Sequence, residues 1–266
     1  MTDVETLPVI RTDIPQSARM WDFWRGGKDN YEIDRTVGEH SRLIYPYIET
    51  IAVQSREFLI RVVSYLAGEA GVHQFIDIGA GLPSSDNTHE VAQRLRPESK
   101  IIWVDNDPMV LAHARALLSS TTSKGATVCC DADFHHPEQI LAGARDVLNF
   151  NEPIAVLFMG VLGHAASHVE MLRIVGTVMD ELVSGSYLAV WDGTDCDHNF
   201  LALWHEYAET GAAPYVPRSR TQILAAFECL ELLDPGLVPI NQWRAPDPLV
   251  GRLQELPAYG GLGRKP

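Results

Sequence analysis

The fold of this chain is decided by residues 75–84, which read FIDIGAGLPS. The first four residues form an apolar run with one acid, typical of a buried strand, and Gly79-Ala80-Gly81 ends that run. Glycines after a strand let the backbone turn tightly and approach a nucleotide closely at the carboxyl edge of a parallel sheet. A complete dinucleotide fingerprint needs a third glycine, but Ser84 stands in its place and Pro83 interrupts the run. The stretch therefore predicts a nucleotide-type site with a weakened pyrophosphate cradle; the alternative is a plain turn.

Asp77 makes the predicted ligand more specific, because its carboxylate stands two residues before the first glycine. A carboxylate at this place repels a pyrophosphate, whereas it can accept a hydrogen bond from an amino group or an ordered water. The position therefore favours a nucleoside-like ligand with a cationic end over NAD or FAD.

Short apolar runs alternate with amphipathic segments on the C-terminal side of this stretch. Strands are predicted at residues 101–104, 127–130, 153–159 and 187–191, and helices at 87–95, 107–118, 137–145 and 169–183. Such an alternation indicates βαβ units, and right-handed crossovers then give a doubly wound α/β fold with a parallel sheet. The turn Asp234-Pro235-Gly236 is too short for a crossover, so it predicts an antiparallel hairpin between residues 227–233 and 237–243.

The N-terminal quarter of the chain has a different texture. Residues 1–20 resemble a loose arm punctuated by prolines, and residues 42–66 show the apolar spacing of a helix. We therefore expect an arm and helical cap over residues 1–70 and an α/β domain over residues 71–266, folded as one structural unit.

Acidic residues also follow the next two predicted strands. Asp105 comes at the tip of the second strand, where an acid can hydrogen-bond a ribose diol, whereas Asp107 is interpreted as the cap of the next helix. Asp133 follows the third strand, and beside Phe134 it can accept a hydrogen bond from the exocyclic amine of adenine. The alternative for each acid is a role confined to its own turn. The fourth strand ends in Met159-Gly160, where small residues leave room for a ligand.

Composition excludes several classes of protein. The chain has 266 residues, 21 Lys plus Arg and 35 Asp plus Glu, and a formal net charge of −14. Such an acidic chain repels phosphate backbones, so no nucleic-acid partner is expected. The apolar stretch 154–162 is too short to cross a bilayer, and residues 1–10 lack the features of a signal or transit peptide. Four cysteines without a CxxC motif favour neither a disulfide scaffold nor a zinc site. We therefore expect a cytoplasmic protein with no metal site and no membrane partner.

Longer motifs make the interpretation more specific. They are residues 26–31 (GGKDNY) with Asp34-Arg35, residues 77–83 (DIGAGLP) with Asn87, residues 89–92 (HEVA), residues 104–115 (VDNDPMVLAHAR), Asp133 with Pro137, residues 234–238 (DPGLV) with Trp243, and residues 263–266 (GRKP). With these motifs the chain resembles, from about Ser17 to its C-terminus, a bacterial family of S-adenosyl-L-methionine-dependent methyltransferase-like proteins. Pro83 replaces the third glycine of commoner methyltransferases, a departure that the resembled family shares. His135-His136 departs from the family pattern, which leaves the role of that loop open.

The resemblance implies a Rossmann-like, seven-stranded sheet with an antiparallel last strand, and an N-terminal helical segment folded over the cofactor S-adenosyl-L-methionine. It implies that Gly79 and Gly81 pass the methionine moiety, with Asp77 near its amino end. Asp105 would hold the ribose, and Asp133 with Phe134 the adenine. The cofactor residues predicted beside these are Ala80, Asn106, Met159 and Gly160.

The stretch from Gly26 to Tyr31 is predicted to contribute to the same site. Gly27 and Asn30 suit a close approach of the backbone, Lys28 can meet the methionine carboxylate, and Tyr31 or Trp24 can face the sulfonium through a cation–π contact. The alternative is that the aromatic side chains form the core of the cap and Lys28 is solvated.

Methyl transfer from a sulfonium needs a general base only if the acceptor must lose a proton. Candidates near predicted carboxyl-edge loops are His164, His168, His198 and Asp192. A single histidine in a loop is more often structural or solvated than catalytic, so the sequence assigns none of them.

Three functions from different classes stay open. The first, which we favour, is a methyltransferase that acts on an unidentified small-molecule acceptor. A homodimer is one assembly that such a protein can form. The second is a dinucleotide-dependent oxidoreductase, against which Asp77 and the absence of a third glycine both count. The third is a non-catalytic protein that binds S-adenosylmethionine, because the sequence reveals a cofactor site but no acceptor site.

Overall fold

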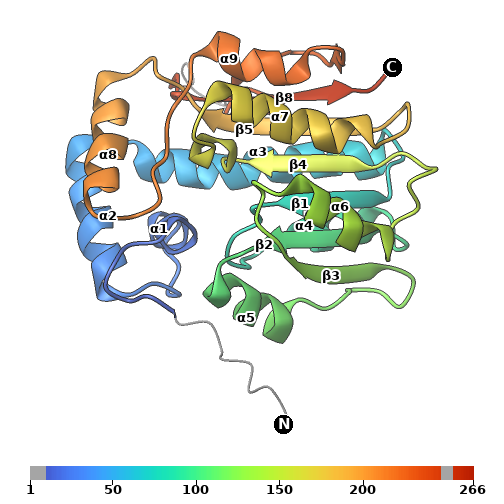
Figure 1. Ribbon diagram of the computed structural model, residues 1–266, viewed down its shortest axis with the longest axis horizontal. Helices are drawn as coiled ribbons and strands as arrows, with labels where there is room; N and C mark the ends of the chain where they lie inside the picture. Colours follow the sequence, from blue (N-terminus) through green and yellow to red (C-terminus); the bar gives the residue numbers. More distant parts are fainter. Residues whose placement is uncertain (1–9, 247–253) are drawn as a thin grey trace.

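The strands form one mixed sheet in the computed structural model, which describes residues 10–246 and 254–266. They are β1 (Gln74–Ile78), β2 (Lys100–Asp105), β3 (Ala126–Asp131), β4 (Ala155–Met159), β5 (Tyr187–Gly193), β6 (Glu231–Leu232), β7 (Val238–Pro239) and β8 (Ala258–Arg264). Their order is β3-β2-β1-β4-β5-β8-β6, with β7 also paired to β8 (Figure 1). The first five strands are parallel and β8 is antiparallel to β5. The predicted α/β fold with an antiparallel last strand is confirmed, with eight strands in the described residues where seven were expected.

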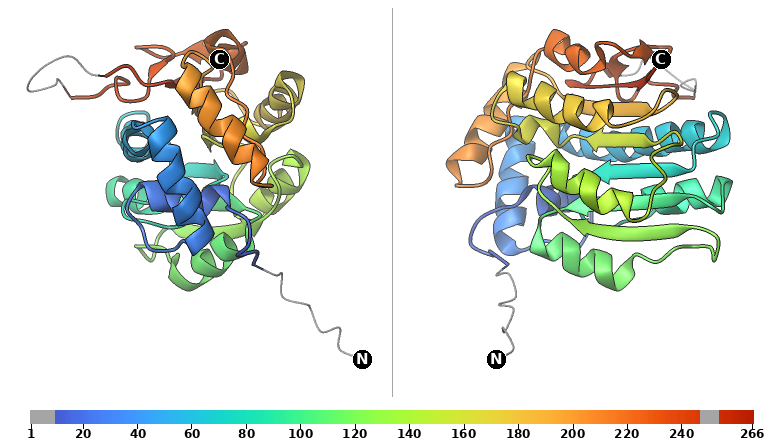
Figure 2. Two further views of the ribbon diagram at one scale, coloured as in Figure 1. Left: turned by 90° about the vertical axis from the view of Figure 1, so that its left-hand side faces the viewer. Right: turned by 45° about the vertical axis from the view of Figure 1, so that its right-hand side comes forward.

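Helices cover both faces of this sheet and the edge at which its parallel strands end (Figures 1 and 2). They are α1 (Ser17–Trp24), α2 (Glu32–Ile44), α3 (Ile48–Gly68), α4 (Thr88–Leu95), α5 (Pro108–Leu117), α6 (Pro137–Arg145), α7 (His168–Asp180), α8 (His198–Glu209) and α9 (Arg220–Leu224), with 3-10 turns η1 (Leu162–His164) and η2 (Ala225–Phe227). The helices α1, α2 and α8 lie together at the carboxyl edge, where they form the cap (Figure 1).

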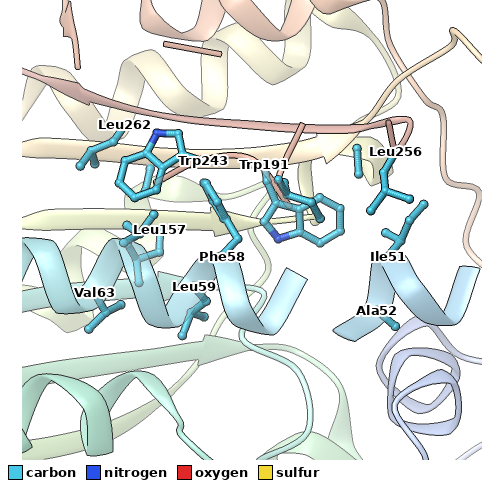
Figure 3. Close-up of a cluster of buried hydrophobic side chains, with 14 of the residues drawn as sticks. Ile51, Ala52, Phe58, Leu59, Val63, Leu157, Trp191, Trp243, Leu256 and Leu262 are labelled. Carbon is cyan, nitrogen blue, oxygen red and sulfur yellow. The ribbon is translucent and has the colours of Figure 1, made fainter. Parts of the chain in front are cut away.

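The sequence of β1 explains why helices form on both faces. Phe75 belongs to the hydrophobic cluster that includes α1, α3 and α8, whereas Ile76 and Ile78 belong to the cluster that includes α6 and α7. Successive side chains of a strand point to opposite faces, so a strand buried along its whole length must be covered twice. Figure 3 shows the first cluster, in which Phe58 of α3 packs beside Trp191 of β5.

The predicted βαβ elements between residues 75 and 191 are present and end close to their predicted limits. Two predicted helix starts are also confirmed. Asn87 and Glu90 form a reciprocal capping box at the start of α4, and Asp107 caps α5 by accepting from the amides of Met109 and Val110. These side chains satisfy amides that have no partner inside the helix.

The predicted antiparallel hairpin around Asp234-Pro235-Gly236 is wrong. β6 and β7 pair one after the other with the same strand, β8, and no ladder joins them to each other in the described residues. The glycines of β8 give this segment little strand propensity, so the sequence pattern predicts no residue range for the last strand. At two of these glycines the neighbouring side chains leave no room for a Cβ. A Cβ on Gly260 would lie 2.6 Å from Phe58 Cζ, and a Cβ on Gly263 would lie 2.8 Å from Phe227 Cδ1.

The predicted helix over residues 42–66 is interrupted. The helix α2 ends at Ile44 and α3 begins at Ile48, because Pro46 disfavours the helical conformation at Tyr45, which has φ −132° and ψ 93°. Side chains of α1 and α3 share one hydrophobic cluster with β1, β4 and β5, and the domain boundary at residue 70 stays a prediction. None of the described helices is long and apolar enough to cross a membrane.

Candidate functional site

A cavity of about 390 Å³ lies at the carboxyl edge of the sheet. Its walls come from the loops after β1 to β4, from β5, from α1 and α3, and from the segment that precedes α1. Most of the predicted cofactor residues line it together, namely Asp77, Gly79, Ala80, Gly81, Asp105, Asn106, Asp133, Phe134, Met159 and Gly160. The parallel strands bring these residues together because their carboxyl ends meet at one edge of the sheet.

Asp77 presents a carboxylate oxygen without a partner. Its side chain is buried, and Oδ2 accepts a hydrogen bond from Thr88 Oγ1 at 2.5 Å. The other oxygen, Oδ1, has no hydrogen-bond partner among the described residues. Burial raises the pKa of Asp77 to about 6, although the Thr88 hydroxyl and the charge of Arg56 act in the opposite direction. A buried acceptor without a partner is costly, so Oδ1 is suited to accept from the amino group of a ligand.

The two glycines after β1 have different reasons to be glycine. Gly79 has φ +68°, and a Cβ there would lie 2.5 Å from Cγ2 of Val161, so only glycine allows the loops after β1 and β4 to touch. Gly81 has φ +72° and open space where a Cβ would stand. Since Gly81 also lines the cavity, its backbone is accessible to a ligand.

Asp105 joins the loops after β1 and β2. Its Oδ2 accepts from the amide of Gly81 at 2.9 Å and its Oδ1 accepts from the amide of Asp107 at 3.0 Å. Burial raises the pKa of Asp105 to about 6 despite these bonds. Each carboxylate oxygen has two lone pairs, so Asp105 can hold the loop and accept from a diol at the same time.

Asp133 is oriented by the histidine pair whose role the sequence left open. Its Oδ1 accepts from the amide of His135 at 3.0 Å and contacts His135 Nδ1 at 2.7 Å. Burial acts to raise the pKa of Asp133, but the hydrogen bonds from His135 and the charges of His135 and His136 bring it below its usual value. Asp133 is therefore an ionised acceptor beside the ring of Phe134 in the cavity wall.

The ends of β4 and β5 form an apolar part of the cavity. Gly160 has φ +80°, and a Cβ there would lie 2.4 Å from Cζ2 of Trp191. The ring of Trp191 therefore packs directly on the backbone after β4. Trp21 of α1 meets this ring edge-on, with centroids 5.5 Å apart, and Met159 lines the same cavity.

Four predicted cofactor residues lie outside the walls of the cavity, namely Gly27, Lys28, Asn30 and Tyr31. Gly27 and Asn30 pack around Asp22 instead. A Cβ on Gly27 would lie 1.9 Å from Asp22 Oδ1, and Asn30 Nδ2 donates to Asp22 Oδ2 at 2.9 Å. Lys28 is exposed to solvent. Gly27 and Asn30 therefore make contacts within the cap and Lys28 is solvated, as in the alternative interpretation of the segment.

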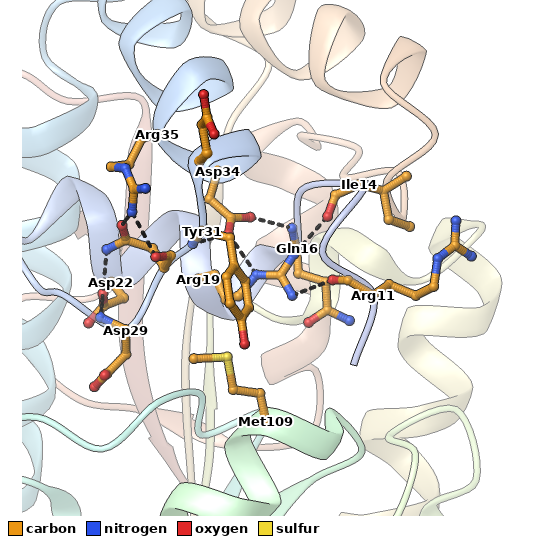
Figure 4. Close-up of polar contacts among 12 residues, drawn as sticks. Arg11, Ile14, Gln16, Arg19, Asp22, Asp29, Tyr31, Asp34, Arg35 and Met109 are labelled. Carbon is orange, nitrogen blue, oxygen red and sulfur yellow. Dashed lines mark hydrogen bonds and ion pairs between the residues drawn. The ribbon is translucent and has the colours of Figure 1, made fainter. Parts of the chain in front are cut away.

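Tyr31 also belongs to the framework of the cap. Its ring packs against the small cluster that contains Leu82 and Met109, and the guanidinium of Arg19 lies 5.1 Å from the ring centroid. Its amide donates to Asp34 Oδ2 at 2.9 Å. Tyr31 thus links the cap to the loop after β1 and to α5, and Figure 4 shows its ring beside Met109.

A buried ion pair between Arg19 and Asp34, at 2.7 Å, fixes the segment before α1 (Figure 4). Arg19 also donates to the carbonyls of Arg11 at 2.8 Å and Ile14 at 2.7 Å. Asp34 accepts from the amide of Gln16 at 3.1 Å. Since Ile14 and Gln16 line the cavity, the described part of the predicted loose arm is an ordered wall of the site.

Two arginines in the cavity wall are absent from the sequence-based site. Arg25 follows α1 and Arg56 lies in α3. Neither guanidinium has an ion-pair or hydrogen-bond partner among the described residues. Burial and then the charge of Arg56 lower the pKa of Arg25 to about 10, so it is a cation at neutral pH. No motif marks either residue, apart from the position of Arg25 directly before the glycine pair.

His164 is the one of the four candidate bases that lines the cavity. Its Nδ1 lies 2.8 Å from the carbonyl oxygen of Pro214, and its Nε2 lies 3.0 Å from Ser17 Oγ. A carbonyl only accepts, so Nδ1 donates and Nε2 keeps its lone pair. Burial lowers the pKa of His164, which keeps the ring neutral with Nε2 available as an acceptor.

The other three candidate bases lie away from the cavity walls. Asp192 is buried, and its Oδ1 accepts from the Tyr215 hydroxyl and from the amide of Gly193 at 2.9 Å. His168 is the first residue of α7. His198 is the first residue of α8 and is exposed. Among the candidates, the geometry retains only His164 as a residue that can touch a ligand in this cavity.

Comparison with known proteins identifies the family of the chain. The chain matches the S-adenosyl methyltransferase family over residues 4–266. The chain belongs to this family. The expected resemblance is therefore confirmed, and S-adenosyl-L-methionine is the cofactor of the family.

Several solved structures share the fold of this chain. A DUF574 family protein from Streptomyces avermitilis has 34% identity and a TM-score of 0.92, over 97% of this chain and 100% of that chain. A candidate methyltransferase from Thermobifida fusca has 36% identity and a TM-score of 0.88, over 98% and 99%. Human N-acetylserotonin methyltransferase has 16% identity and a TM-score of 0.50, over 88% and 57%, and shares the fold alone. No curated protein sequence matches the chain.

The donor set of the cavity fits the cofactor of the S-adenosyl methyltransferase family. The orphaned Oδ1 of Asp77 suits an ammonium group, and an unpaired guanidinium suits a carboxylate. Asp105 suits a ribose diol, and the aromatic ring of Phe134 beside Asp133 suits an adenine. Within residues 10–246 and 254–266, no group of three His, Cys, Asp or Glu side chains is arranged to hold a metal ion.

Proposed function

We propose that this protein transfers the methyl group of S-adenosyl-L-methionine to a small-molecule acceptor. The observation that carries the proposal is that one cavity contains both a carboxylate oxygen without a partner, on Asp77, and a guanidinium without a partner among the described residues, on Arg56. The two groups are complementary to the amino and carboxylate groups of an amino acid moiety. When bound, the cofactor supplies an electrophilic methyl group, which bonds to a lone pair of the acceptor while the carbon–sulfur electron pair stays on sulfur.

The chain's own residues hold the cofactor at three places. Asp77 accepts from the amino group, and Arg56 donates to the carboxylate through charge-assisted hydrogen bonds. Asp105 accepts from the ribose hydroxyls, while its bonds to the loop amides keep it in place. Asp133 accepts from the adenine amine, and its ionised state makes this bond stronger.

The cap positions the acceptor and excludes water. The segment with Ile14 and Gln16 covers the cavity and is fixed by a buried ion pair. The rings of Trp21 and Trp191 supply an apolar surface beside Met159. Holding the reacting atoms in line in a dry cavity contributes to the rate because the orientation is fixed before reaction.

An acceptor that must lose a proton can give it to His164. The carbonyl of Pro214 fixes its tautomer, so the lone pair of Nε2 faces Ser17 in the cavity wall. Because burial lowers the pKa of His164, the ring is in its basic form at neutral pH. The Ser17 hydroxyl is bonded to this lone pair, so a proton from the acceptor reaches Nε2 through Ser17 Oγ, which takes it up as its own proton passes to His164.

The competing functions are less well supported. A dinucleotide-dependent oxidoreductase needs a pyrophosphate cradle, and Asp77 places a carboxylate beside that position. A non-catalytic protein that binds S-adenosylmethionine would share the cofactor residues and differ only in the absence of transfer. A cytoplasmic location, a homodimer, and the absence of nucleic-acid and membrane partners stay predictions.

Cofactor selectivity tests the proposal. We expect S-adenosylhomocysteine to bind the wild-type protein in calorimetry, and Asp105→Ala to lower its affinity about tenfold or more, because a hydrogen bond to a charged group is lost. Arg145→Gln, at an exposed ion pair with Glu181, is the control and leaves the affinity unchanged. Tighter binding of NADH than of S-adenosylhomocysteine would contradict the proposal.

Transfer itself is measured separately. The protein is incubated with S-adenosylmethionine carrying a labelled methyl group and a panel of small metabolites, and label in a product is counted. We expect a labelled product and, for an acceptor that must lose a proton, a loss of rate in His164→Ala. Binding of the cofactor without transfer to any member of the panel would favour the non-catalytic alternative.

A further inference from the structure

The cavity contains two guanidinium groups, whereas the cofactor carries a single carboxylate. Arg25 and Arg56 both line it, and neither has an ion-pair partner among the described residues. S-adenosylmethionine carries one carboxylate, and its other charged groups, the ammonium and the sulfonium, are cations. When Arg56 takes this carboxylate, Arg25 stays without an anion among the described residues. An unpaired charge in a partly buried site is unfavourable, so a second anionic ligand is indicated.

The surroundings distinguish the two arginines. The charge of Asp77 is the largest of those that raise the pKa of Arg56, which places this arginine near Asp77. The amino and carboxylate groups of a methionine moiety share one carbon, so they bind neighbouring side chains. When Asp77 takes the amino group, Arg56 is the arginine within reach of the carboxylate. Arg25 is the one that is left over, since the charges that act on it are those of Arg56 and Asp22.

Asp22 is not the missing partner of Arg25. Its Oδ2 accepts from the amide of Asp29 at 2.9 Å and from Asn30 Nδ2 at 2.9 Å. Its Oδ1 packs against the backbone of Gly27. In the part of the chain that the structure describes, no ion pair joins Asp22 to Arg25, because the turn after α1 holds this carboxylate.

Aromatic and aliphatic side chains stand beside the free guanidinium. Trp21 precedes Arg25 by one helical turn, so the two side chains lie on the same side of α1. Trp21 meets Trp191 edge-on, and Leu59 of α3 lines the same cavity. The cavity thus offers an apolar surface with one cation beside it.

We propose that the methyl acceptor is a small carboxylic acid with a flat apolar body. Its carboxylate pairs with Arg25, and its body lies against Trp21 and Trp191. The planar fork of a guanidinium matches a carboxylate with two parallel hydrogen bonds, which selects acids over neutral compounds of the same shape. This inference rests on the proposed methyl transfer and names the class of its acceptor.

The test is calorimetry on the full chain saturated with S-adenosylhomocysteine. The probes are benzoate, phenylacetate and indole-3-acetate, each compared with its neutral amide, and phenyl phosphate as a different anion. We expect at least one acid to bind, with its amide weaker by about tenfold or more, because a hydrogen bond to a charged group is lost.

Variants of the two arginines test which ligand each of them binds. Arg25→Gln is expected to lower the affinity for the acid about tenfold and to leave the affinities for its amide and for S-adenosylhomocysteine within about threefold of wild type. Arg56→Gln is expected to lower the affinity for S-adenosylhomocysteine about tenfold. Arg145→Gln controls for the loss of one positive charge. If Arg25→Gln does not fold, Arg25→Lys and the comparison of acid with amide in the wild type carry the test.

Several outcomes would overturn the inference. An equal loss of S-adenosylhomocysteine affinity in Arg25→Gln and Arg56→Gln would assign both arginines to the cofactor. Failure of every acid to bind, equal binding of acid and amide, or tighter binding of phenyl phosphate would exclude a carboxylic acid. Failure of the wild type to bind S-adenosylhomocysteine is a separate result, and it would overturn the proposed function instead.

Discussion

The surroundings of Asp77 indicate which kind of ligand the cavity favours. The side chain is 2% exposed, yet one of its oxygens has no partner among the described residues. The fold thus keeps a carboxylate in a place where, without a ligand, its charge is unfavourable. Burial raises the pKa of Asp77 to about 6, and an ammonium group from a ligand would favour the ionised form again.

Asp77→Asn is expected to reduce the loss of stability between pH 5 and pH 7 in the ligand-free protein. Folded Asp77 holds a proton up to about pH 6, whereas in the unfolded chain its pKa is near 3.8. The stabilisation by this proton is complete below about pH 3.8 and is lost as the pH rises to about 6, by roughly 3 kcal/mol in all; about 1 kcal/mol of this loss falls between pH 5 and pH 7. Urea unfolding at both pH values measures this loss. Asp131→Asn, at an exposed carboxylate, is the control, and equal pH slopes in wild type and Asp77→Asn would contradict the assignment.

At the scale of elements, the junction of β4 and β5 depends on a glycine. Gly160 combines φ +80° with the ring of Trp191 packed on its backbone. This contact positions an aromatic wall of the cavity at the end of two adjacent parallel strands. A side chain at this position must displace the ring as well as strain the backbone.

Gly160→Ala is therefore expected to destabilise the protein by about 1–3 kcal/mol and to weaken binding of S-adenosylhomocysteine. Gly176→Ala is the matched control. Gly176 lies within α7 and has open space where a Cβ would stand, so alanine there is expected to stabilise the helix by up to about 1 kcal/mol. Thermal unfolding of both variants measures the contrast. Equal effects of the two substitutions would show that the ring of Trp191 has room to move.

At the scale of the whole molecule, the cap and the sheet line one cavity together. The wall that contains Ile14 and Gln16 is connected to the cap by Arg19 and Asp34, whose side chains are 1% and 0% exposed. Breaking a buried ion pair leaves a charge without compensation. The stability of the cap and the closure of the cavity therefore depend on the same pair.

Asp34→Asn is expected to cost about 3–5 kcal/mol of unfolding free energy. The variant should also increase hydrogen exchange in residues 10–18 more than in α7, because Asp34 accepts from the amide of Gln16. Glu39→Gln removes an exposed ion pair with Arg42 and is expected to cost less than about 1 kcal/mol. Unchanged exchange in residues 10–18 would show that other contacts hold the wall.

Much of the fold follows from patterns within short segments of the chain. Apolar runs and helical periods arise over a few residues, so β1 to β5 and the helices between them could be predicted. The acids Asp77, Asp105 and Asp133 could be predicted as a cavity wall because parallel strands with right-handed crossovers end at one edge. The chemistry of that edge then follows from residue types alone.

The identity of the distant residues that line the cavity depends on how the elements pack against one another. Arg25 and Arg56 belong to no motif that indicates a ligand site, and they reach the cavity because α1 and α3 pack beside it. The same packing places the Gly26–Tyr31 segment around Asp22 and leaves Lys28 exposed. The glycines of β8 form a strand by pairing with β5, and Phe58 and Phe227 occupy the space that side chains at Gly260 and Gly263 would need. Contacts between elements depend on the shapes of both partners, and a pattern within one segment of sequence does not contain that information.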